Sequence, residues 1–582
     1  MDKNTILAII IITIIILLLP TYYKLIYQEP EISVVRNDSD SAKYEQSSPK
    51  EDEMVIDETR EVKESYDIQP ESETTKADIF SIDEDTVQSF LEISTPLIST
   101  KISSKGGGKI IYWYLKKYKT WLDEPVLIID EKTGNGLEIN FLTTNGEKVD
   151  LNMYNFFCDK KQERRFILQQ SDSLSINYTI EILGIPLEKR ITFYGDKYHI
   201  DLQISIAHPN QLLLNNEYQI GWIGGLPSNE ENIEEDYTYS EAYASMGDEI
   251  EDFSIESDEV IDDKTLIGNT DWIAIRTKYF LSAIVPREIQ TIGTTIGGSG
   301  VKMGDVLQRR YNAFINILKM SSPSNDSYRV YLGPLDYSIL SDYENGLDDL
   351  VLSHGWYERT FRAISLPIVA LLKFLYIFIP NYGIVIVIFS ILVKIVVYPL
   401  TKKSYKSMKE MSRVQPLLAE LREKYKGDPQ RLNKETMKLY KEHGINPLGG
   451  CLPMLLQLPL LAALFIVFRS TIQLRGASFI PGWIDDLSRP DTIFNLPFSL
   501  PLYGDQFNLL PIFMAGSMIF QSKMTMQDPK QKAMVYLMPV FMLLIFNQFP
   551  SGLNLYYTLF NVLTIIQQKI TDNKGATIKV KK

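Results

Sequence analysis

The chain has few of the residues on which most catalytic and metal sites depend. Its 582 residues include two cysteines, Cys158 and Cys451. The four histidines are His199, His208, His354 and His443. Two cysteines in differently placed regions do not form a disulfide framework, and the histidines lack metal-ligand spacing. The motifs G-x-S-x-G and G-x-x-x-x-G-K-[ST] do not occur. The sequence therefore predicts no enzymatic activity, no metal and no cofactor.

Basic residues are scarce in two long acidic stretches. Glu29–Thr75 has 15 acidic and 5 basic residues, and Ser228–Asp263 has 15 acidic residues and no lysine or arginine. Together they carry −25 against a total of −14, so the rest of the chain is net positive, mainly in its C-terminal third. This balance argues against nucleic-acid binding by the whole chain and predicts local basic surfaces.

The N-terminus is apolar from Ile6 to Leu19 and lacks a small-x-small cleavage site. Tyr22 and Tyr23 follow, as in an interfacial aromatic belt. These features favour an uncleaved transmembrane anchor over residues 1–28, with a cleaved signal peptide as the alternative. Residues 29–78 are rich in Ser, Glu, Asp and Pro, which predicts a disordered acidic linker.

Residues 79–355 have the alternating pattern of a mostly β domain. ITFYGDKYHIDLQISI and SYRVYLGPLDY are two such runs. Turn signals separate the runs at Asn135-Gly136, Asn145-Gly146 and Gly195-Asp196. We expect an antiparallel two-sheet sandwich that is large enough to bury a core.

The last third predicts a membrane body. Residues 356–381 contain Arg362, Pro367 and Lys373 and favour an interfacial amphipathic helix, and residues 382–400 can span a bilayer. Residues 448–570 hold four more apolar segments. Their predicted bounds are Gly449–Phe468, Asn508–Ile519 with its flanks, Val535–Phe549 and Leu553–Ile570. With the N-terminal anchor, we expect six transmembrane helices.

The loop charges give an orientation. Residues 401–447 carry 12 cations and six acids, Ser522–Lys532 carries three lysines, and the tail at 571–582 is basic, so all three should face the cytoplasm. Thr471–Gln506 has two arginines and four aspartates and should lie outside. This topology places the β domain outside the cytoplasm.

The basic loop has the composition of a helical hairpin, with segments Lys402–Lys426 and Pro429–Lys441. Asp428 is placed as an N-cap and Gly444 as a stop. From charge alone, a solvated connector and a docking surface stay equally open. Lys402, Lys403 and Lys406 would supply the charge of such a surface. Its adaptable contacts would be Met408 and Met411, with Met437.

Lys394 lies within the apolar run FSILVKIVVYPL. Its side chain could snorkel to the cytoplasmic interface, or it could line a polar cavity with Ser390, which lies one turn earlier. The other spans also carry polar residues: Gln457, Asn547, Gln548, Asn554, Asn561, Gln567 and Gln568. Each amide alone is typical of an interhelical hydrogen bond, but together with a lysine they favour the cavity.

Three segments resemble the YidC/Oxa/Alb membrane protein insertases, and the large outer domain resembles the Gram-negative YidC type. The segments are YPLTKKSYKSMKEMSRVQPLLAELREKYKGDPQRLNKETMKLYKEHGINPLGGCLPMLLQLPLLAALF, FPSGLNLYYTLFNVLTIIQQ and YRVYLGPLDY. The resemblance implies a multi-pass protein of the bacterial inner membrane with a periplasmic β-super-sandwich. It also implies five core helices around a groove that is open to the cytosol and to lipid.

The resemblance implies roles for particular residues and partners. The substrate groove would contain Lys394, Ser390, Gln457, Tyr556 and Tyr557. Substrate-contacting helix faces would include Pro453, Met454 and Pro459. The family usually has arginine where this chain has Lys394. The lysine keeps the positive charge but cannot form the bidentate hydrogen bonds of a guanidinium. Implied partners are nascent membrane proteins, the lipid bilayer, the Sec translocon, the ribosome and the signal recognition particle pathway.

Two other classes of protein stay open from the residues themselves. A multi-pass solute transporter or channel also suits intramembrane charge, although transporters usually show internal repeats, and no convincing repeat relates the two halves. A structural envelope protein would need only an anchor, for which a polar helix bundle with a basic hairpin is excessive.

Overall fold

The computed structural model describes residues 88–160, 164–247, 249–255, 262–304, 306–319, 325–343, 345–443, 452–525 and 532–575. The predicted N-terminal anchor, the acidic linker, Gly444 and the end of the basic tail lie outside these residues.

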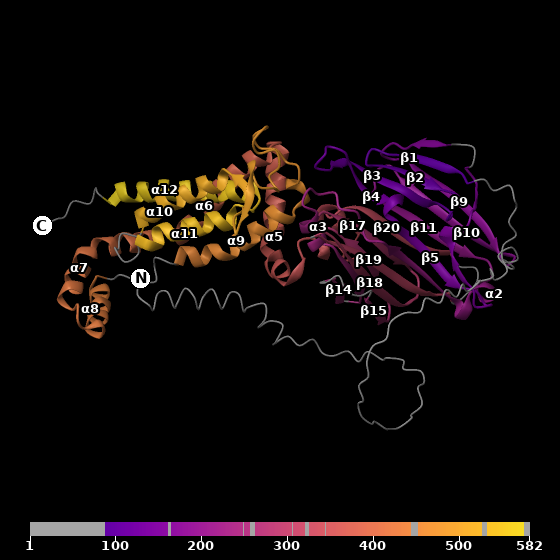
Figure 1. The fold of residues 1–582 in the computed structure, drawn as a ribbon, viewed down its shortest axis with the longest axis horizontal. Coiled ribbons are helices and arrows are strands. Elements are labelled where there is room, and N and C mark those ends of the chain that lie inside the picture. The colour runs from indigo at the N-terminus through magenta and orange to yellow at the C-terminus, as the bar shows by residue number, and fades with distance from the viewer. Residues whose placement is uncertain are drawn as a thin grey trace, which may run out of the picture. The chain divides into compact units, whose positions relative to one another are not determined.

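The described part of the β domain contains three sheets (Figure 1). The nine-stranded sheet has the order β14 (Glu249–Phe253), β13 (Glu241–Met246), β16 (Trp272–Arg276), β17 (Phe280–Arg287), β20 (Asn325–Pro334), β11 (His199–Ile206), β10 (Ile185–Tyr194), β9 (Ser173–Ile182) and β7 (Phe157–Cys158). The six-stranded sheet has the order β15 (Asp262–Ile267), β18 (Thr291–Met303), β19 (Val306–Leu318), β12 (Glu217–Ile223), β5 (Gly136–Leu142) and β6 (Lys148–Asp150). The five-stranded sheet has the order β4 (Pro125–Asp130), β3 (Lys109–Lys119), β2 (Ile98–Ser103), β1 (Phe90–Ser94) and β8 (Arg165–Ile167).

The nine-stranded sheet packs against both of the others. Strands β13 and β16 contact β18 and β19 of the six-stranded sheet. Trp113 on β3 of the five-stranded sheet donates its indole N–H to the Leu332 carbonyl on β20 at 3.1 Å. The predicted sandwich is confirmed, but its second layer is divided between two sheets. Periodicity could not predict this division, because it depends on which strands pair over long distances in the chain.

The alternating pattern of the sequence corresponds to burial in the strands. In β11 the side chains of Ile200, Leu202, Ile204 and Ile206 are buried, while the residues between them are half-buried. Among the described strands, the pairings within these three sheets are antiparallel except β1 with β8. The turn at Asn145-Gly146 joins β5 to β6, as predicted.

Among the described residues, three short helices belong to the β domain and eight longer ones follow it. The short helices are α2 (Pro209–Leu212), α3 (Ile233–Thr238) and α4 (Tyr337–Leu340). The others are α5 (Gly355–Phe378), α6 (Tyr382–Arg413), α7 (Gln415–Lys424), α8 (Pro429–Glu442), α9 (Leu452–Ser470), α10 (Leu510–Thr525), α11 (Lys532–Phe546) and α12 (Ser551–Gly575). A β hairpin, β21 (Thr492–Leu500) with β22 (Gly504–Asn508), lies between α9 and α10 in the chain.

The helix that contains Lys394 is longer than the sequence suggested. We expected a span that ends at Leu400 and a separate helix from Lys402, but α6 continues through Pro399 to Arg413. A single proline removes one backbone hydrogen bond, which a long helix can tolerate. The break comes at Val414, after which α7 begins. The predicted N-cap of α8 is confirmed, since the Asp428 side chain accepts from the backbone N–H of Arg431 at 3.0 Å.

Among the described residues, two helical segments are long and apolar enough to cross a bilayer: Gly355–Phe378 and Tyr382–Pro399. The segments Gln457–Ser470 and Val535–Phe546 are apolar but shorter. Gly355–Phe378 is helix α5, for which we expected an interfacial position. Its length and composition also suit a transmembrane span. The count of six transmembrane helices stays a prediction.

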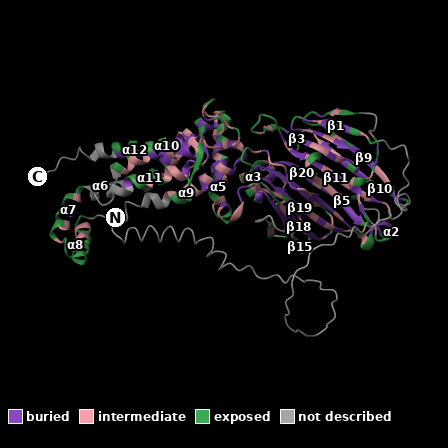
Figure 2. Ribbon diagram, in the orientation of Figure 1, coloured by how far each residue is buried: buried purple, intermediate pink, exposed green. Residues whose placement is uncertain are grey.

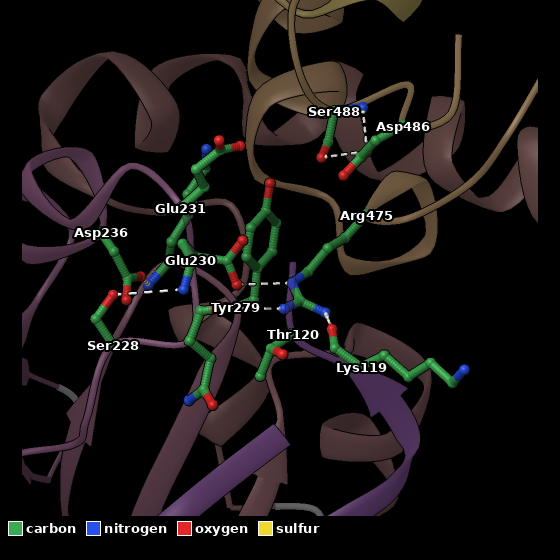
Figure 3. A network of polar contacts seen from close by, with 12 residues as sticks. Lys119, Thr120, Ser228, Glu230, Glu231, Asp236, Tyr279, Arg475, Asp486 and Ser488 are labelled. Carbon is green, nitrogen blue, oxygen red and sulfur yellow. Dashed lines mark hydrogen bonds and ion pairs between the residues drawn. The ribbon is translucent and has the colours of Figure 1, made fainter. Parts of the chain in front are cut away.

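The chain that follows α9 contacts the β domain through Arg475 (Figure 3). Its guanidinium pairs with Glu230 at 2.7 Å and donates to the Lys119 carbonyl at 2.6 Å. The same group lies over the rings of Tyr279 and Phe280, 5.7 and 5.4 Å from their centroids. The Arg475 side chain is buried, so this ion pair is a part of the packed structure rather than a surface contact.

Two further arginines contact the same acidic stretch. Arg489 pairs with Glu231 at 2.7 Å, and Arg469 pairs with Glu235 at 2.9 Å. The stretch Ser228–Asp263, which has no basic residue of its own, therefore receives cations from residues more than 200 positions later in the chain. We call the contacts of Glu230, Glu231 and Glu235 with these arginines the arginine junction.

Candidate functional site

Helix α6 has an apolar outer face, and its inner face combines polar side chains with buried apolar ones such as Ile386 and Phe389. Ser390, Lys394 and Thr401 are buried, whereas Ile395 and Val396 are exposed, the latter at 72%. A spacing of four residues places Ser390 and Lys394 on one side of the helix. Buried and exposed segments likewise alternate along the helices in Figure 2. This is the arrangement expected of a helix whose outer surroundings are lipid and whose inner surroundings are protein.

The Lys394 ammonium lies between α6 and α12. The side chain is 8% exposed, and its Nζ donates to the Thr564 hydroxyl at 2.7 Å. The same nitrogen lies 4.4 Å from the centroid of the Phe560 ring. Thr564 in turn donates to the Phe560 carbonyl at 2.7 Å, which fixes its hydroxyl as an acceptor for the lysine. Lys394 therefore does not snorkel to an exposed position; it is buried against a hydroxyl and an aromatic face.

A stripe of buried polar and aromatic residues continues along α12. It includes Tyr556, Phe560, Thr564 and Gln568, which recur every four residues and so share one face. The Tyr556 hydroxyl and both amide atoms of Gln568 are buried, and within the described part of the chain they have no hydrogen-bond partner. Buried polar atoms normally have partners, so these groups are available to bind water or a polar ligand.

The predicted groove residues do not all face the same neighbours. The Ser390 hydroxyl is buried and donates to the Ile386 carbonyl at 2.7 Å. The Tyr556 ring lies 5.9 Å from that of Phe389 on α6, but the Tyr557 ring lies 5.4 Å from that of Phe546 on α11. The structure thus brings Tyr556 toward the Lys394 helix and Tyr557 toward α11.

The remaining predicted residues lie on α9 and at the end of α6. Gln457 is half-buried and Pro459 is exposed, and neither is among the Lys394 contacts given above. The side chains of several predicted residues fall outside the described part of the structure. They are Pro453, Met454, Lys402, Lys403, Lys406, Met408 and Met411.

Sequence reasoning missed Thr564 and Phe560, two residues in contact with Lys394. The available signal was the four-residue spacing Tyr556–Phe560–Thr564–Gln568, which marks one helix face. It did not show that this face meets Lys394, which lies 170 residues earlier than Thr564.

Comparison with known proteins places the chain in a family. Residues 374–578 match the family described as the 60Kd inner membrane protein, and residues 91–371 match the YidC periplasmic domain. The membrane protein insertase YidC of Chlorobaculum parvum is 36% identical over 491 residues, which cover 83% of this chain and 82% of the relative. The chain belongs to the YidC family of membrane protein insertases.

A second sequence relative agrees with this assignment. The membrane protein insertase YidC of Prosthecochloris aestuarii is 37% identical over 512 residues, which cover 86% of this chain and 85% of the relative. A crystal structure of an active YidC insertase is 17% identical, covers 84% of this chain and 95% of its own, and superposes with a TM-score of 0.33. The family assignment rests on the sequence relatives, and it identifies the β domain as a periplasmic domain attached to an inner-membrane helical region.

Proposed function

We propose that this insertase guides polar segments of nascent membrane proteins through a groove in its helical region, with Lys394 as the positive charge of the groove. One observation carries the proposal: the Lys394 ammonium is buried between α6 and α12 against the Thr564 hydroxyl and the Phe560 ring. A buried cation is costly in a membrane protein and usually marks a functional position.

The physical effect of such a groove is to lower the cost of desolvation. When a polar or acidic segment leaves water for hydrocarbon, each polar group without a hydrogen-bond partner costs on the order of several kcal/mol of free energy. A positive charge, together with the Tyr556 hydroxyl and the Gln568 amide, offers that segment partners while its apolar part moves into lipid. The contacts of Lys394 with a hydroxyl and a ring can be exchanged for contacts with a carboxylate.

The predicted topology assigns the other parts of the chain. The β domain lies in the periplasm, and α7, α8 and the C-terminus lie in the cytoplasm. Among the described residues of α7 and α8, most side chains are exposed, apart from a small apolar cluster of Val414, Leu418, Leu439 and Tyr440. This exposure supports a docking role for the helical hairpin toward the ribosome, the signal recognition particle pathway or the Sec translocon.

Photocrosslinking to a stalled nascent membrane protein tests the groove. A photoreactive phenylalanine at position 560 lies beside Lys394, and the same residue at position 541 replaces an exposed phenylalanine of α11. We expect polar segments of the nascent chain to crosslink at position 560 and not at position 541. Equal crosslinking of polar segments at both positions would contradict the groove. The same probe at position 403 should reach ribosomal proteins if the helical hairpin docks there.

A further inference from the structure

The β hairpin between α9 and α10, residues 492–508, exposes an unusual number of large apolar side chains. Phe498 is 58% exposed and Leu502 is 63% exposed, and Ile493, Phe494 and Leu500 are exposed as well. No charged residue occurs between Asp491 and Asp505. Exposed apolar clusters of this kind mark binding surfaces for another protein or for a membrane.

Exposed apolar side chains extend along the whole of the first strand, from Ile493 to Leu500. The strand register shifts between Thr492 and Phe494, so Ile493 lies at a bulge that turns the strand locally. The hairpin adjoins α10, which the predicted topology places in the membrane. Lipid is therefore the apolar medium next to these side chains.

The turn and the second strand of the hairpin are fixed to the helical region by buried amides. Asn547, which follows α11, donates its side-chain N–H groups to the Tyr503 carbonyl at 2.9 Å and to the Gln506 carbonyl at 2.7 Å. Asn508 donates to the Asn547 carbonyl, and both asparagines are fully buried. The exposed first strand is therefore held by a fixed second strand and turn rather than by an unstructured loop.

The hairpin is also joined directly to the start of α10. The Asp491 carboxylate accepts from the backbone N–H groups of Leu509 and Leu510, at 3.0 and 2.8 Å, and so caps the helix at the point where the hairpin begins and ends. In the predicted topology this end of α10 is at the periplasmic surface of the membrane, so the hairpin lies at the same level.

We propose that the apolar segment of the hairpin, from Ile493 to Leu502, inserts into the outer leaflet of the lipid bilayer and fixes the depth of the outer ends of α10 and α11. Asn495 pairs with Gln506 and the next pair is Leu500 with Gly504, so residues 496–499 have no partner position in the second strand. Their backbone groups need water, which limits the insertion to the headgroup and upper acyl region. This inference rests on the proposed topology and not on the groove at Lys394.

Depth-dependent fluorescence quenching tests the insertion with the full-length protein in vesicles of phosphatidylcholine and phosphatidylglycerol. In a background with Cys158 and Cys451 replaced by serine, Phe498→Cys carries a bimane label. Ile267→Cys, which replaces an apolar residue of the β domain that is 91% exposed, is the matched control. We expect a lipid with a spin label near the top of its acyl chain to quench position 498 at least about twofold more than position 267, and aqueous iodide to show the reverse order.

Two results would overturn the inference. Equal iodide quenching at positions 498 and 267 would show that the apolar segment lies in water. Protection of position 498 from both quenchers would show that protein covers it. The measurement does not use insertion activity, so it is independent of the groove: a Lys394→Glu variant that no longer inserts substrates should retain the quenching at position 498.

Discussion

Both regions of the molecule contain buried cations, and the described partners of these cations differ. In the β domain, the fully buried Lys319 pairs with Asp326 at 2.9 Å, and at the arginine junction Arg475 pairs with Glu230. In the helical region, the described contacts of the Lys394 ammonium include a hydroxyl and an aromatic ring. A carboxylate neutralises a cation, whereas a hydroxyl or a ring solvates it without cancelling its charge. The division is not strict, since Lys189 of the β domain donates to the Gly106 carbonyl at 2.7 Å.

The described partners suggest different roles for Lys394 and for the cations that pair with carboxylates. A cation that is matched by a carboxylate contributes to a particular fold, and removal of one partner leaves the other charge buried and unpaired. A cation that is solvated by neutral groups keeps an electrostatic potential that can attract an acidic segment of another chain. The comparison thus predicts that substitutions at Lys394 alter insertion, whereas substitutions at the junction alter stability.

Charge reversal at Lys394 should have the largest effect. We expect Lys394→Glu to reduce insertion of substrates with acidic translocated segments at least about tenfold, because two unit charges about 4 Å apart interact by about 4 kcal/mol in partly solvated protein. Lys394→Arg should stay within about twofold of the wild type, since the charge is kept. Insertion into reconstituted vesicles measures both.

Substrates with uncharged translocated segments provide the control, and their insertion should change much less. If Lys394→Ala still inserted a broad set of acidic substrates fully, the charge of Lys394 would not be needed for insertion. Lys394 would then be a structural residue like Lys319.

Removal of Arg475 should destabilise the junction without a direct effect on the groove. Arg475→Ala leaves Glu230 without its buried partner, which costs about 3–5 kcal/mol. Arg489→Ala is the matched control, because its ion pair with Glu231 is partly exposed and such pairs contribute under about 1 kcal/mol. Thermal unfolding and hydrogen exchange of residues 228–238 should distinguish the two variants. Equal destabilisation would show that burial does not decide the strength of these pairs.

A smaller effect of pH is expected at Asp236, one residue after Glu235. Burial, and then the nearby Glu230 charge, raises the pKa of this carboxyl to about 6. The folded protein therefore favours the protonated form, so stability is greatest at low pH and decreases as the pH rises through about 6, by at most about 3 kcal/mol. Asp236→Asn should flatten this dependence between pH 4 and 7 while leaving the effect of other groups. An unchanged slope of the unfolding midpoint against pH would contradict this assignment.

Glu235 changes in the opposite direction. Burial opposes ionisation of this carboxyl, but Lys278 and Arg469 outweigh burial and lower its pKa. Its contribution is complete above the ordinary pKa of a glutamate and is lost as the pH falls through the lowered value. The two neighbouring carboxyls should therefore give the junction a stability maximum at intermediate pH.

Much of the local structure follows from the sequence. Alternation predicts the strands, as in β11, and Asp428 followed by Pro429 predicts the start of α8. The apolar segments near the C-terminus correspond to α9, α10, α11 and α12. These features depend on residues that are close together in the chain, so periodicity and capping are sufficient to find them.

The partners of the charged residues do not follow in the same way. The acidic stretch has no basic residue of its own, yet Arg469, Arg475 and Arg489 pair with its glutamates across more than 200 residues. The β hairpin was also missed, because its apolar residues lie in a segment that loop charge alone assigned to the outside.

The sequence by itself determined that the chain combines a β domain with apolar helices, and that one of those helices carries a lysine. Only the tertiary structure decided what surrounds that lysine, because Thr564 and Phe560 reach it through the packing of α12 on α6. Periodicity assigns a residue to a face of its own element, whereas the charge, hydroxyl or ring that meets that face depends on which elements pack together.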